Sequence, residues 1–232
     1  MVKWMYVSDV HVPHNDVYMT ERFLEDLKYE CPDYVILGGD ILDMWAVSAH
    51  SKDPKDGQAL NEEFDAAKVF IKNVRKAAKK AQIVFLEGNH EARLKKYLLH
   101  NASAIAGLKS LELKTLLDLD TYNIEWVPDT QLYFIEDFLF RHGHEMFGFS
   151  GVPGNNARKG IATYHSNYIQ GHIHKANIIH VGNARVNFIG VENPCLCSMD
   201  PSYMKGAASW QQGYTIGELD DNERWQIRQV VR

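Results

Sequence analysis

The stretch Tyr34-Val35-Ile36-Leu37-Gly38-Gly39-Asp40-Ile41-Leu42-Asp43 decides the fold. Its apolar run 34–37 lies between Pro32 and two glycines, a pattern typical of a short buried strand that ends in a tight turn. Asp40 then follows the carboxyl end of the strand, where open α/β sheets bind their ligands. Because glycine has no side chain, the Gly38-Gly39 pair allows the backbone to approach a bound group closely. A carboxylate at this place is suited to bridge two metal ions, since each oxygen can serve one ion.

Four further apolar runs end in Asp, Asn or His side chains. Two of them deliver pairs with one residue between the members, Asp9 with His11 and His172 with His174. In an extended chain such a pair points to one side, so its members can share an ion. The runs and the residues that follow them are 4–7 with Asp9 and His11, 83–86 with Asn89 and His90, 138–141 with His142, and 168–170 with His172 and His174.

Taken together, these motifs resemble the calcineurin-like metallophosphoesterase family. Asp-x-His, Gly-Asp-x-x-Asp, Gly-Asn-His-Glu, a single His before Gly, and Gly-His-x-His follow one another between positions 9 and 174. Each motif alone is weakly specific, but all five in this order, each after an apolar run, are a strong signal. A weaker resemblance, to phage- and prophage-encoded members, lies in the segments 193–197 and 210–214.

The resemblance implies a site with two divalent metal ions. Mixed carboxylate, amide and imidazole ligands suit Mn, Fe, Ni, Co or Zn better than Mg or Ca, and Mn is the expected metal. Asp40 would bridge the two ions. The first ion would be held by Asp9, His11 and His174, and the second by Asn89, His142 and His172.

The same resemblance implies a mechanism. Two ions lower the pKa of a bridging water and neutralise phosphate oxygens, so that a hydroxide attacks phosphorus in line. His90 is implied as the general acid for the leaving oxygen, with a structural histidine as the alternative. Asp43 has the family's position for a carboxylate that orients a ligand such as His11. Arg93 fits either a phosphate contact or a surface salt bridge, and His144 fits either the site or its supporting loop.

The first half of the chain predicts strands alternating with helices. Asp16 is expected to cap a helix that ends near Glu30. A polar loop is expected over 45–59, and a helix with one apolar stripe over 60–81. Residues 91–118 are helical in character, with a break at Gly107.

From residue 122 onward, short strands alternate with turns and favour an antiparallel meander, with a long loop over 143–160. The first half of the chain thus predicts parallel strands joined by helices, and the second half an antiparallel meander. Two facing sheets with helices on their outer sides are compatible with both halves. The family's fold is this arrangement, an α/β four-layer α-β-β-α sandwich of two mixed sheets flanked by helices. Because the ligand motifs run through most of the chain, residues 1–232 are expected to form a single domain.

Composition limits the remaining choices. The chain has 232 residues, 45% of them hydrophobic and 24% charged, and a formal net charge of −5. No apolar run approaches the roughly 20 residues of a membrane span, and the N-terminus does not resemble a signal peptide, so a cytoplasmic protein without membrane association is expected. Cys195 and Cys197 are too close for an easy disulfide, which favours reduced thiols. The negative charge argues against a broad grip on nucleic acid, although two ions would attract a phosphate substrate.

These observations predict a dinuclear metal-dependent phosphoesterase, with hydrolysis of a phosphodiester of nucleotide or nucleic-acid type as the leading hypothesis. One alternative is a phosphomonoesterase that acts on a small phosphorylated metabolite. The other is a non-catalytic interaction platform of the same fold, an example of which is the retromer subunit of this family. Trp210 and Tyr203 are candidates to stack on a base, although packing at the rim of the site is the alternative.

Overall fold

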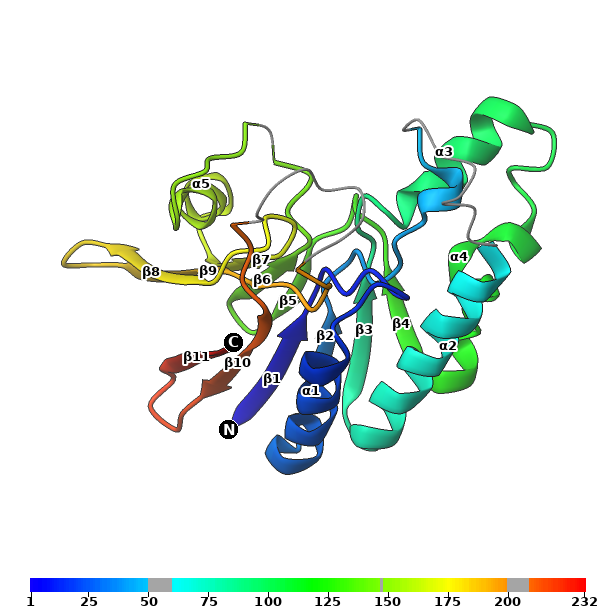
Figure 1. The fold of residues 1–232 in the computed structure, drawn as a ribbon. Helices are drawn as coiled ribbons and strands as arrows, with labels where there is room; N and C mark the ends of the chain where they lie inside the picture. Colours follow the sequence, from blue (N-terminus) through cyan, green and yellow to red (C-terminus); the bar gives the residue numbers. More distant parts are fainter. Residues whose placement is uncertain (50–59, 147, 200–208) are drawn as a thin grey trace.

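The computed structural model describes residues 1–49, 60–146, 148–199 and 209–232. Its first sheet has six strands in the order β11-β10-β1-β2-β3-β4 (Figure 1). Strands β1 to β4 run parallel, as the alternating pattern of the first half predicted. Strand β10 pairs antiparallel with β1, and β11 with β10. The bounds are β1 (Val2–Val7), β2 (Tyr34–Leu37), β3 (Gln82–Leu86), β4 (Ile124–Val127), β10 (Gly213–Leu219) and β11 (Trp225–Val231).

The second sheet has five strands in the order β5-β6-β7-β9-β8. Its outer pairs β5/β6 and β8/β9 are antiparallel, but β6, β7 and β9 run parallel, so the expected continuous meander is wrong here. The reason is a helical crossover between β6 and β7, because parallel strands need a long connection. The bounds are β5 (Tyr133–Ile135), β6 (Phe138–Arg141), β7 (Asn167–Gln170), β8 (Asn177–Gly182) and β9 (Asn187–Glu192).

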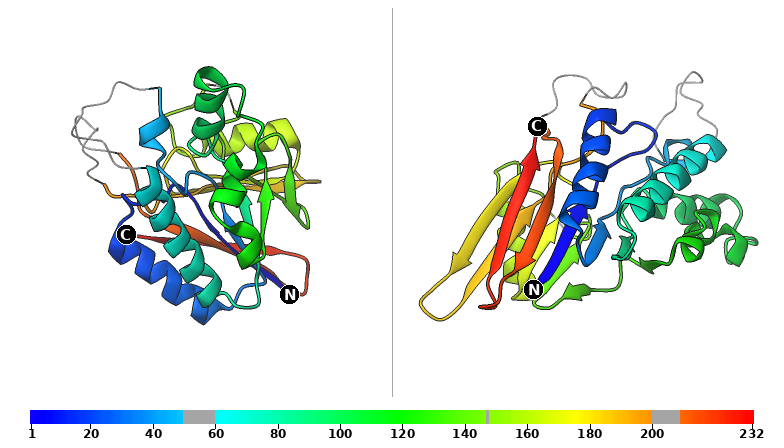
Figure 2. Two further views of the ribbon diagram at one scale, coloured as in Figure 1. Left: turned by 90° about the vertical axis from the view of Figure 1, so that its right-hand side faces the viewer. Right: turned by 90° about the horizontal axis from the view of Figure 1, so that it is seen from below.

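Side-chain alternation along the strands builds the layers of the molecule. In β1, Met5 and Val7 join the core under the helices, whereas Trp4 and Tyr6 join the core between the two sheets. Strands β2 and β3 divide their residues in the same way. Because successive side chains of a strand point to opposite faces, each strand contributes to both cores. The result is the expected four-layer sandwich, whose layers Figure 2 shows from two further directions.

Helices α1 (Val17–Glu30) and α2 (Leu60–Ala77) cover the outer face of the first sheet (Figure 1). Asp16 caps α1 as predicted, since its side chain accepts a hydrogen bond of 2.9 Å from the backbone N–H of Met19. Helix α2 ends four residues before the predicted position 81. Beyond this end the Arg75 guanidinium donates to the carbonyl oxygens of Ala78 and Ala81, and so holds the turn that leads into β3.

The region 91–118 forms several short elements, as the break at Gly107 indicated. Helix α3 (Ala92–Asn101) is followed by a turn, and then by the short helices η3 (Lys109–Leu111), α4 (Leu113–Leu116) and η4 (Leu119–Tyr122). The predicted loop 45–59 begins with the 3₁₀ turn η1 (Trp45–Val47), and its residues 50–59 lie outside the described part.

The predicted loop 143–160 is wrong in its second part, because helix α5 (Asn155–Tyr164) begins there. Its sequence holds two asparagines and Gly160, which are poor helix formers. The missing stabilisation comes from Glu192 on β9, a buried carboxylate that accepts hydrogen bonds from the backbone N–H groups of Gly154, Asn156 and Ala157. A carboxylate at the first turn of a helix satisfies free N–H groups and favours the helix dipole.

The two sheets are joined directly below the motif Gly38-Gly39-Asp40. The Tyr6 hydroxyl contacts the carbonyl oxygen of Gly38 on the first sheet and, at 2.8 Å, that of Arg141 on the second. A side chain at Gly38 would have its Cβ only 2.1 Å from the Tyr6 ring, so glycine is required for this close approach. In the described residues, no helix has the length and apolar character needed to cross a membrane.

Candidate metal centre

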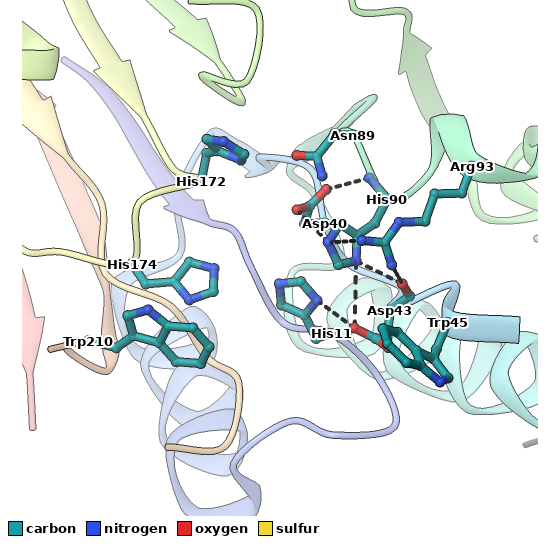
Figure 3. Close-up of a pocket in the computed structure, with 10 residues that line it drawn as sticks. All are labelled: His11, Asp40, Asp43, Trp45, Asn89, His90, Arg93, His172, His174 and Trp210. Atoms are coloured by element: carbon teal, nitrogen blue, oxygen red, sulfur yellow. Dashed lines mark hydrogen bonds and ion pairs between the residues drawn. The ribbon is translucent and has the colours of Figure 1, made fainter. Parts of the chain in front are cut away.

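The carboxyl ends of strands from both sheets meet around one open pocket of about 550 Å³ (Figure 3). All seven predicted ligands and His90 come together at this place. Asp9 and His142 do not line the pocket; they are buried behind it, with 0% and 1% of their surface exposed. The pocket is lined by His11, Asp40, Asp43, Trp45, Asn89, His90, Arg93, His172, His174 and Trp210.

The first group of donor atoms belongs to Asp9, His11 and His174, which lie within 4.8 Å of one another. The Nε2 atom of His174 lies 3.1 Å from Oδ1 of Asp9. The same carboxylate accepts hydrogen bonds from the backbone N–H of His172 and, at 2.6 Å, from the Ser8 hydroxyl. These contacts hold the carboxylate in one orientation and leave the group able to bind one cation.

The second group belongs to Asp40, His142 and His172, again within 4.8 Å. The Nε2 atom of His142 lies 3.2 Å from Oδ2 of Asp40 and 3.2 Å from Oδ1 of Asn89, so the amide oxygen joins this group. Asp40 also lies within 4.8 Å of a donor atom of His11. Asp40 therefore stands between the two groups, where the sequence predicted a bridging carboxylate.

Three of the histidines present Nε2 to the centre and hold Nδ1 outward. Nδ1 of His11 lies 3.1 Å from Oδ1 of Asp43, and Nδ1 of His142 lies 2.9 Å from the carbonyl oxygen of Gly38. Nδ1 of His174 faces the Cys197 sulfur at 3.8 Å. Oxygen partners such as those of His11 and His142 orient metal-binding histidines. Among the described residues, the buried Nε2 of His11 has no hydrogen-bond partner, which fits a metal ligand.

The backbone of the centre is strained in a consistent way. Five of the seven predicted ligands have left-handed backbone conformations, although none is glycine. Such conformations are uncommon outside glycine and concentrate at functional sites, where the surrounding structure compensates for their energy. The residues and their φ angles are Asp9 (55°), His11 (51°), Asp40 (51°), His172 (68°) and His174 (56°).

The charges at the centre are paired. Burial would lower the pKa of His142 and His174, but the facing carboxylates of Asp40 and Asp9 raise it to about 10 in both. Burial would likewise raise the pKa of the two carboxyls, and the neighbouring histidines hold it below its usual range. For His172, burial and the charge of His142 lower the pKa to about 4. The ionised carboxylates are thus balanced by the positive charge of His142 and His174. Two bound metal cations would supply this positive charge in place of the protons.

His90 lies at the edge of the centre, with Nε2 3.6 Å from Oδ2 of Asp40. Its Nδ1 donates to the carbonyl oxygen of Asp43 at 2.7 Å, because a carbonyl can only accept. Its Nε2 lies 2.8 Å from Nη2 of Arg93, which can only donate, so Nε2 is the acceptor. Arg93 also donates to the Asp43 carbonyl at 2.7 Å and is therefore no surface salt bridge.

Glu91 has a role at the site that its position in the sequence did not indicate. It directly precedes α3. Its buried carboxylate, however, accepts hydrogen bonds from the backbone N–H groups of Asp40, Ile41, Leu42 and Gly88, and so holds the loop that carries Asp40. Burial, and next the charge of Asp40, raise the pKa of Glu91 to about 7.

The glycine pair serves the protein rather than a ligand. Gly39 has a left-handed φ of 88°, and a Cβ there would lie 2.7 Å from the His142 ring. His144 lies outside the pocket lining and pairs with Asp129 at 3.4 Å, which favours the supporting role. Trp45 lines the site although no sequence motif indicated it. Cys195 and Cys197 were expected only to be reduced thiols, and their one-residue separation was the available signal that they lie together. Tyr203 lies outside the described residues.

Comparison with known proteins agrees with this geometry. A family model described as calcineurin-like phosphoesterase matches residues 3–176. The Gene 54 protein of Mycobacterium phage L5 is 25% identical over 230 residues, covering 92% of this chain and 88% of the phage protein. The match confirms the resemblance to phage-encoded members.

Two solved structures are also similar. Wild-type Vps29 from Entamoeba histolytica, complexed with Zn²⁺, is 13% identical over 99% of both chains, with a TM-score of 0.50. A dimetal phosphatase from Danio rerio is 9% identical, covering 98% of this chain and 95% of the other, with a TM-score of 0.48. The Vps29 structure shares the fold. With the family model matched over most of its length, the chain belongs to the calcineurin-like phosphoesterase family.

Proposed function

We propose that this protein is a dinuclear metal-dependent phosphoesterase that hydrolyses phosphodiesters. The observation that carries the proposal is the joining of two donor groups through Asp40 beside an open pocket. In this assignment Asp9, His11 and His174 would hold one ion, Asn89, His142 and His172 would hold the other, and Asp40 would serve both. Two ions held there would activate a water nucleophile and neutralise phosphate charge. The mixed oxygen and nitrogen donors support Mn²⁺ as the metal to test first.

The lining of the pocket supports a diester over a monoester. A diester carries one negative charge on phosphate and a second organic group, whereas a monoester dianion needs more positive charge. Among the lining residues that the structure describes, Arg93 is the only permanent cation, and Trp45 and Trp210 add large apolar surfaces to the lining. These aromatic surfaces suit the organic groups of a nucleotide or nucleic-acid diester, since aromatic rings stack on bases.

His90 is proposed to donate the proton that the leaving oxygen needs. In the structure its Nε2 accepts a hydrogen bond from Arg93, so this nitrogen carries no proton until the contact is released. A guanidinium binds phosphate through two parallel hydrogen bonds, which gives Arg93 a stronger partner when substrate enters. Transfer of Arg93 from His90 to the phosphate would free Nε2 to take up a proton and to act as the acid.

The test is hydrolysis of bis(p-nitrophenyl) phosphate against p-nitrophenyl phosphate by protein stripped of metal and reloaded with Mn²⁺, Zn²⁺, Ni²⁺ or Mg²⁺. We expect faster turnover of the diester and no turnover without metal. Faster turnover of the monoester would contradict the diester assignment. Absence of turnover of both substrates with two ions bound would contradict the phosphoesterase itself and favour an interaction platform.

The role of His90 is tested with His90→Ala. General acid catalysis contributes about 10²- to 10⁴-fold, so kcat on the diester should fall by that factor while two ions remain bound. The matched control is His100→Ala, because His100 lies exposed on α3, away from the pocket lining. Full diester turnover by the metal-loaded His90→Ala protein would remove His90 from the mechanism.

A further inference from the structure

A second cluster of metal-binding side chains adjoins the dinuclear centre on the other edge of the His174 ring. It consists of His174, Cys195 and Cys197, whose donor atoms lie within 4.8 Å of one another. The three side chains are buried, with 7%, 0% and 3% of their surface exposed. Nε2 of His174 faces Asp9, whereas Nδ1 faces the Cys197 sulfur, so one imidazole connects both clusters.

The contact at Nδ1 of His174 differs from the corresponding contacts in the centre. Nδ1 of His11 and of His142 meet oxygen atoms at 3.1 and 2.9 Å, which are ordinary hydrogen bonds. In the part of the chain that the structure describes, the partner of Nδ1 of His174 is a sulfur atom, that of Cys197, at 3.8 Å. This separation is long for an orienting hydrogen bond, but it is suitable for two ligands that share an ion.

Zinc geometry supports that interpretation. Zn–S bonds of about 2.3 Å and Zn–N bonds of about 2.0–2.1 Å at a tetrahedral angle place the two ligand atoms about 3.6 Å apart. The observed N···S separation is 3.8 Å. The Cys195 sulfur lies 3.4 Å from the carbonyl oxygen of Gln211, so an oxygen is also close to the cluster. The His174–Cys197 pair is therefore spaced close to one edge of a coordination tetrahedron, and the Cys195 sulfur lies within 4.8 Å of both atoms.

The backbone holds both cysteines in place. The N–H groups of Leu196 and Cys197 both donate to the carbonyl oxygen of Asp9, at 3.1 and 3.0 Å. Gln211 closes the other side, because its carbonyl accepts from the N–H of Cys195 and its N–H donates to the carbonyl of His174, both at 2.9 Å. A rigid support of this kind is what a preorganised metal site requires.

We propose that Nδ1 of His174 and the sulfur atoms of Cys195 and Cys197 bind a third divalent cation of the thiophilic class, such as Zn²⁺. The proposal rests on the proposed function in one respect, since His174 also serves the dinuclear centre. Binding replaces three protons, one from each thiol and one from Nδ1, and these protons leave to solvent. His174 then bridges as an imidazolate between the third ion and the ion beside Asp9.

Donor softness separates the third site from the first two. Thiolates select Zn²⁺ and related ions, whereas carboxylate, amide and imidazole donors also accept Mn²⁺. Protein loaded with Mn²⁺ should therefore hold two ions per chain, and the first equivalent of added Co²⁺ or Zn²⁺ should enter the thiolate site. Co²⁺ is the informative probe, because thiolate ligation gives it an intense charge-transfer absorption in the near ultraviolet.

The experiment is a Co²⁺ titration of Mn²⁺-loaded protein, followed by absorption and by metal analysis after gel filtration. The expected result is one Co²⁺ per chain and a charge-transfer band. Cys195→Ser and Cys197→Ser should each lose that ion and the band, while both retain two Mn²⁺. Cys31→Ser is the matched control, because Cys31 is exposed and lies far along the chain from the cluster.

Two further arms separate this inference from the proposed function. His142→Ala removes a ligand of the dinuclear centre but none of the third site, so it should lose diester turnover and keep the Co²⁺ band. A protein without phosphodiesterase activity but with the band would overturn the proposed function alone. The third site would be overturned if folded, Mn²⁺-loaded protein showed no charge-transfer band after Co²⁺ was added. A band that persists in Cys197→Ser would overturn it as well. Near-ultraviolet circular dichroism establishes that each variant is folded.

Discussion

Asp43 is the residue on which the orientation of His11 depends. Its Oδ1 lies 3.1 Å from Nδ1 of His11 and 3.6 Å from Nδ1 of His90, and all three side chains meet below the pocket (Figure 3). Burial would raise the pKa of Asp43, but the hydrogen bond from His11 and the nearby His90 ring hold it below its usual range. Asp43 is therefore ionised at neutral pH and increases the basicity of the ligand it holds.

Replacing Asp43 by Asn should weaken metal binding without removing a ligand. Loss of such a supporting carboxylate costs about 10- to 100-fold in metal affinity, and the effect should fall on the ion beside His11. Titration of the metal-free protein with Mn²⁺, followed by the paramagnetic signal of the free ion, measures this. Asp65→Asn is the matched control, because Asp65 is exposed on α2. Equal affinities for Asp43→Asn and the unchanged protein would contradict the orienting role.

Helix α5 contains a glycine that lowers its helix propensity but that its packing requires. Gly160 lies in the middle of this helix, where alanine normally improves stability by about 1 kcal/mol. A Cβ at Gly160, however, would lie 2.2 Å from the Tyr168 ring on β7. Close packing of the helix on the second sheet therefore requires glycine at this position, whatever its helix propensity.

Gly160→Ala should consequently destabilise the protein by about 1–3 kcal/mol, the usual cost of overpacking a core. Denaturant unfolding measures the change. Gly107→Ala serves as the comparison, because no atom lies within 4 Å of the Cβ it would add and its backbone is not left-handed. Equal stabilities of the two variants would show that α5 does not pack on Tyr168 as described.

Helix α2 begins with a buried carboxylate that is sensitive to pH. Glu63 accepts a short hydrogen bond from the backbone N–H of Met44, and only 2% of its surface is exposed. Burial raises its pKa to about 7. The folded state thus binds this proton more tightly than the unfolded state, whose ordinary value is 4.5. The resulting stabilisation is complete below that value and is lost as the pH rises through 7.

Glu63→Gln should remove this pH dependence, because Gln keeps the acceptor oxygen and does not ionise. Relative to the unchanged protein, its free energy of unfolding should increase by up to about 3 kcal/mol between pH 4.5 and pH 8. Denaturant unfolding at a series of pH values measures the difference between the two proteins. Glu62→Gln, an exposed neighbour, should show no such trend. A constant difference between the Glu63→Gln and unchanged proteins across this range would refute the argument.

At the scale of the whole molecule, the centre lies where the two sheets meet, so metal binding acts on the stability of the entire fold. Paired charges and left-handed ligand residues gather at this junction. A ligand that binds only the folded state stabilises it by about 2.7 kcal/mol at a concentration 100 times its dissociation constant. Each of two ions would add a term of this kind.

Thermal unfolding with EDTA and with excess Mn²⁺ should therefore give clearly separated midpoints, with the metal-loaded protein more stable. His142→Ala should show a smaller separation, since it loses one ligand of the second ion. Identical midpoints for the unchanged protein under both conditions would contradict metal binding at this junction.

The first and last strands of the chain belong to the same sheet, where β10 pairs with the N-terminal strand β1 and the C-terminal strand β11 pairs with β10. Residues 213–219 thereby complete the sheet that residues 2–7 begin, and β11 closes its edge. For this reason we propose that residues 1–232 form a single domain. The family model matches only residues 3–176, but the structure needs the remaining strands to cover β1.

Much of the fold and the centre could be predicted because the informative signals are local. Apolar runs of four or five residues mark buried strands, and the polar residues that follow them lie at strand ends, where both sheets present ligands. This reasoning located all seven candidate ligands and His90, which the structure places together. It also predicted the Asp16 cap, while the contact of Asp43 with His11 was implied by the resemblance to the family.

Only the tertiary structure decided the partners that come from distant parts of the chain. Glu192 stabilises a helix that begins at residue 155, Glu91 holds the Asp40 loop, and Cys197 faces His174. The parallel pairing of β6, β7 and β9 likewise depends on the crossover through α5. Sequence periodicity indicates which face of a helix or strand is buried. It does not indicate which side chains of other elements that face contacts. That choice depends on the packing of the layers, which fixes which groups approach within bonding distance.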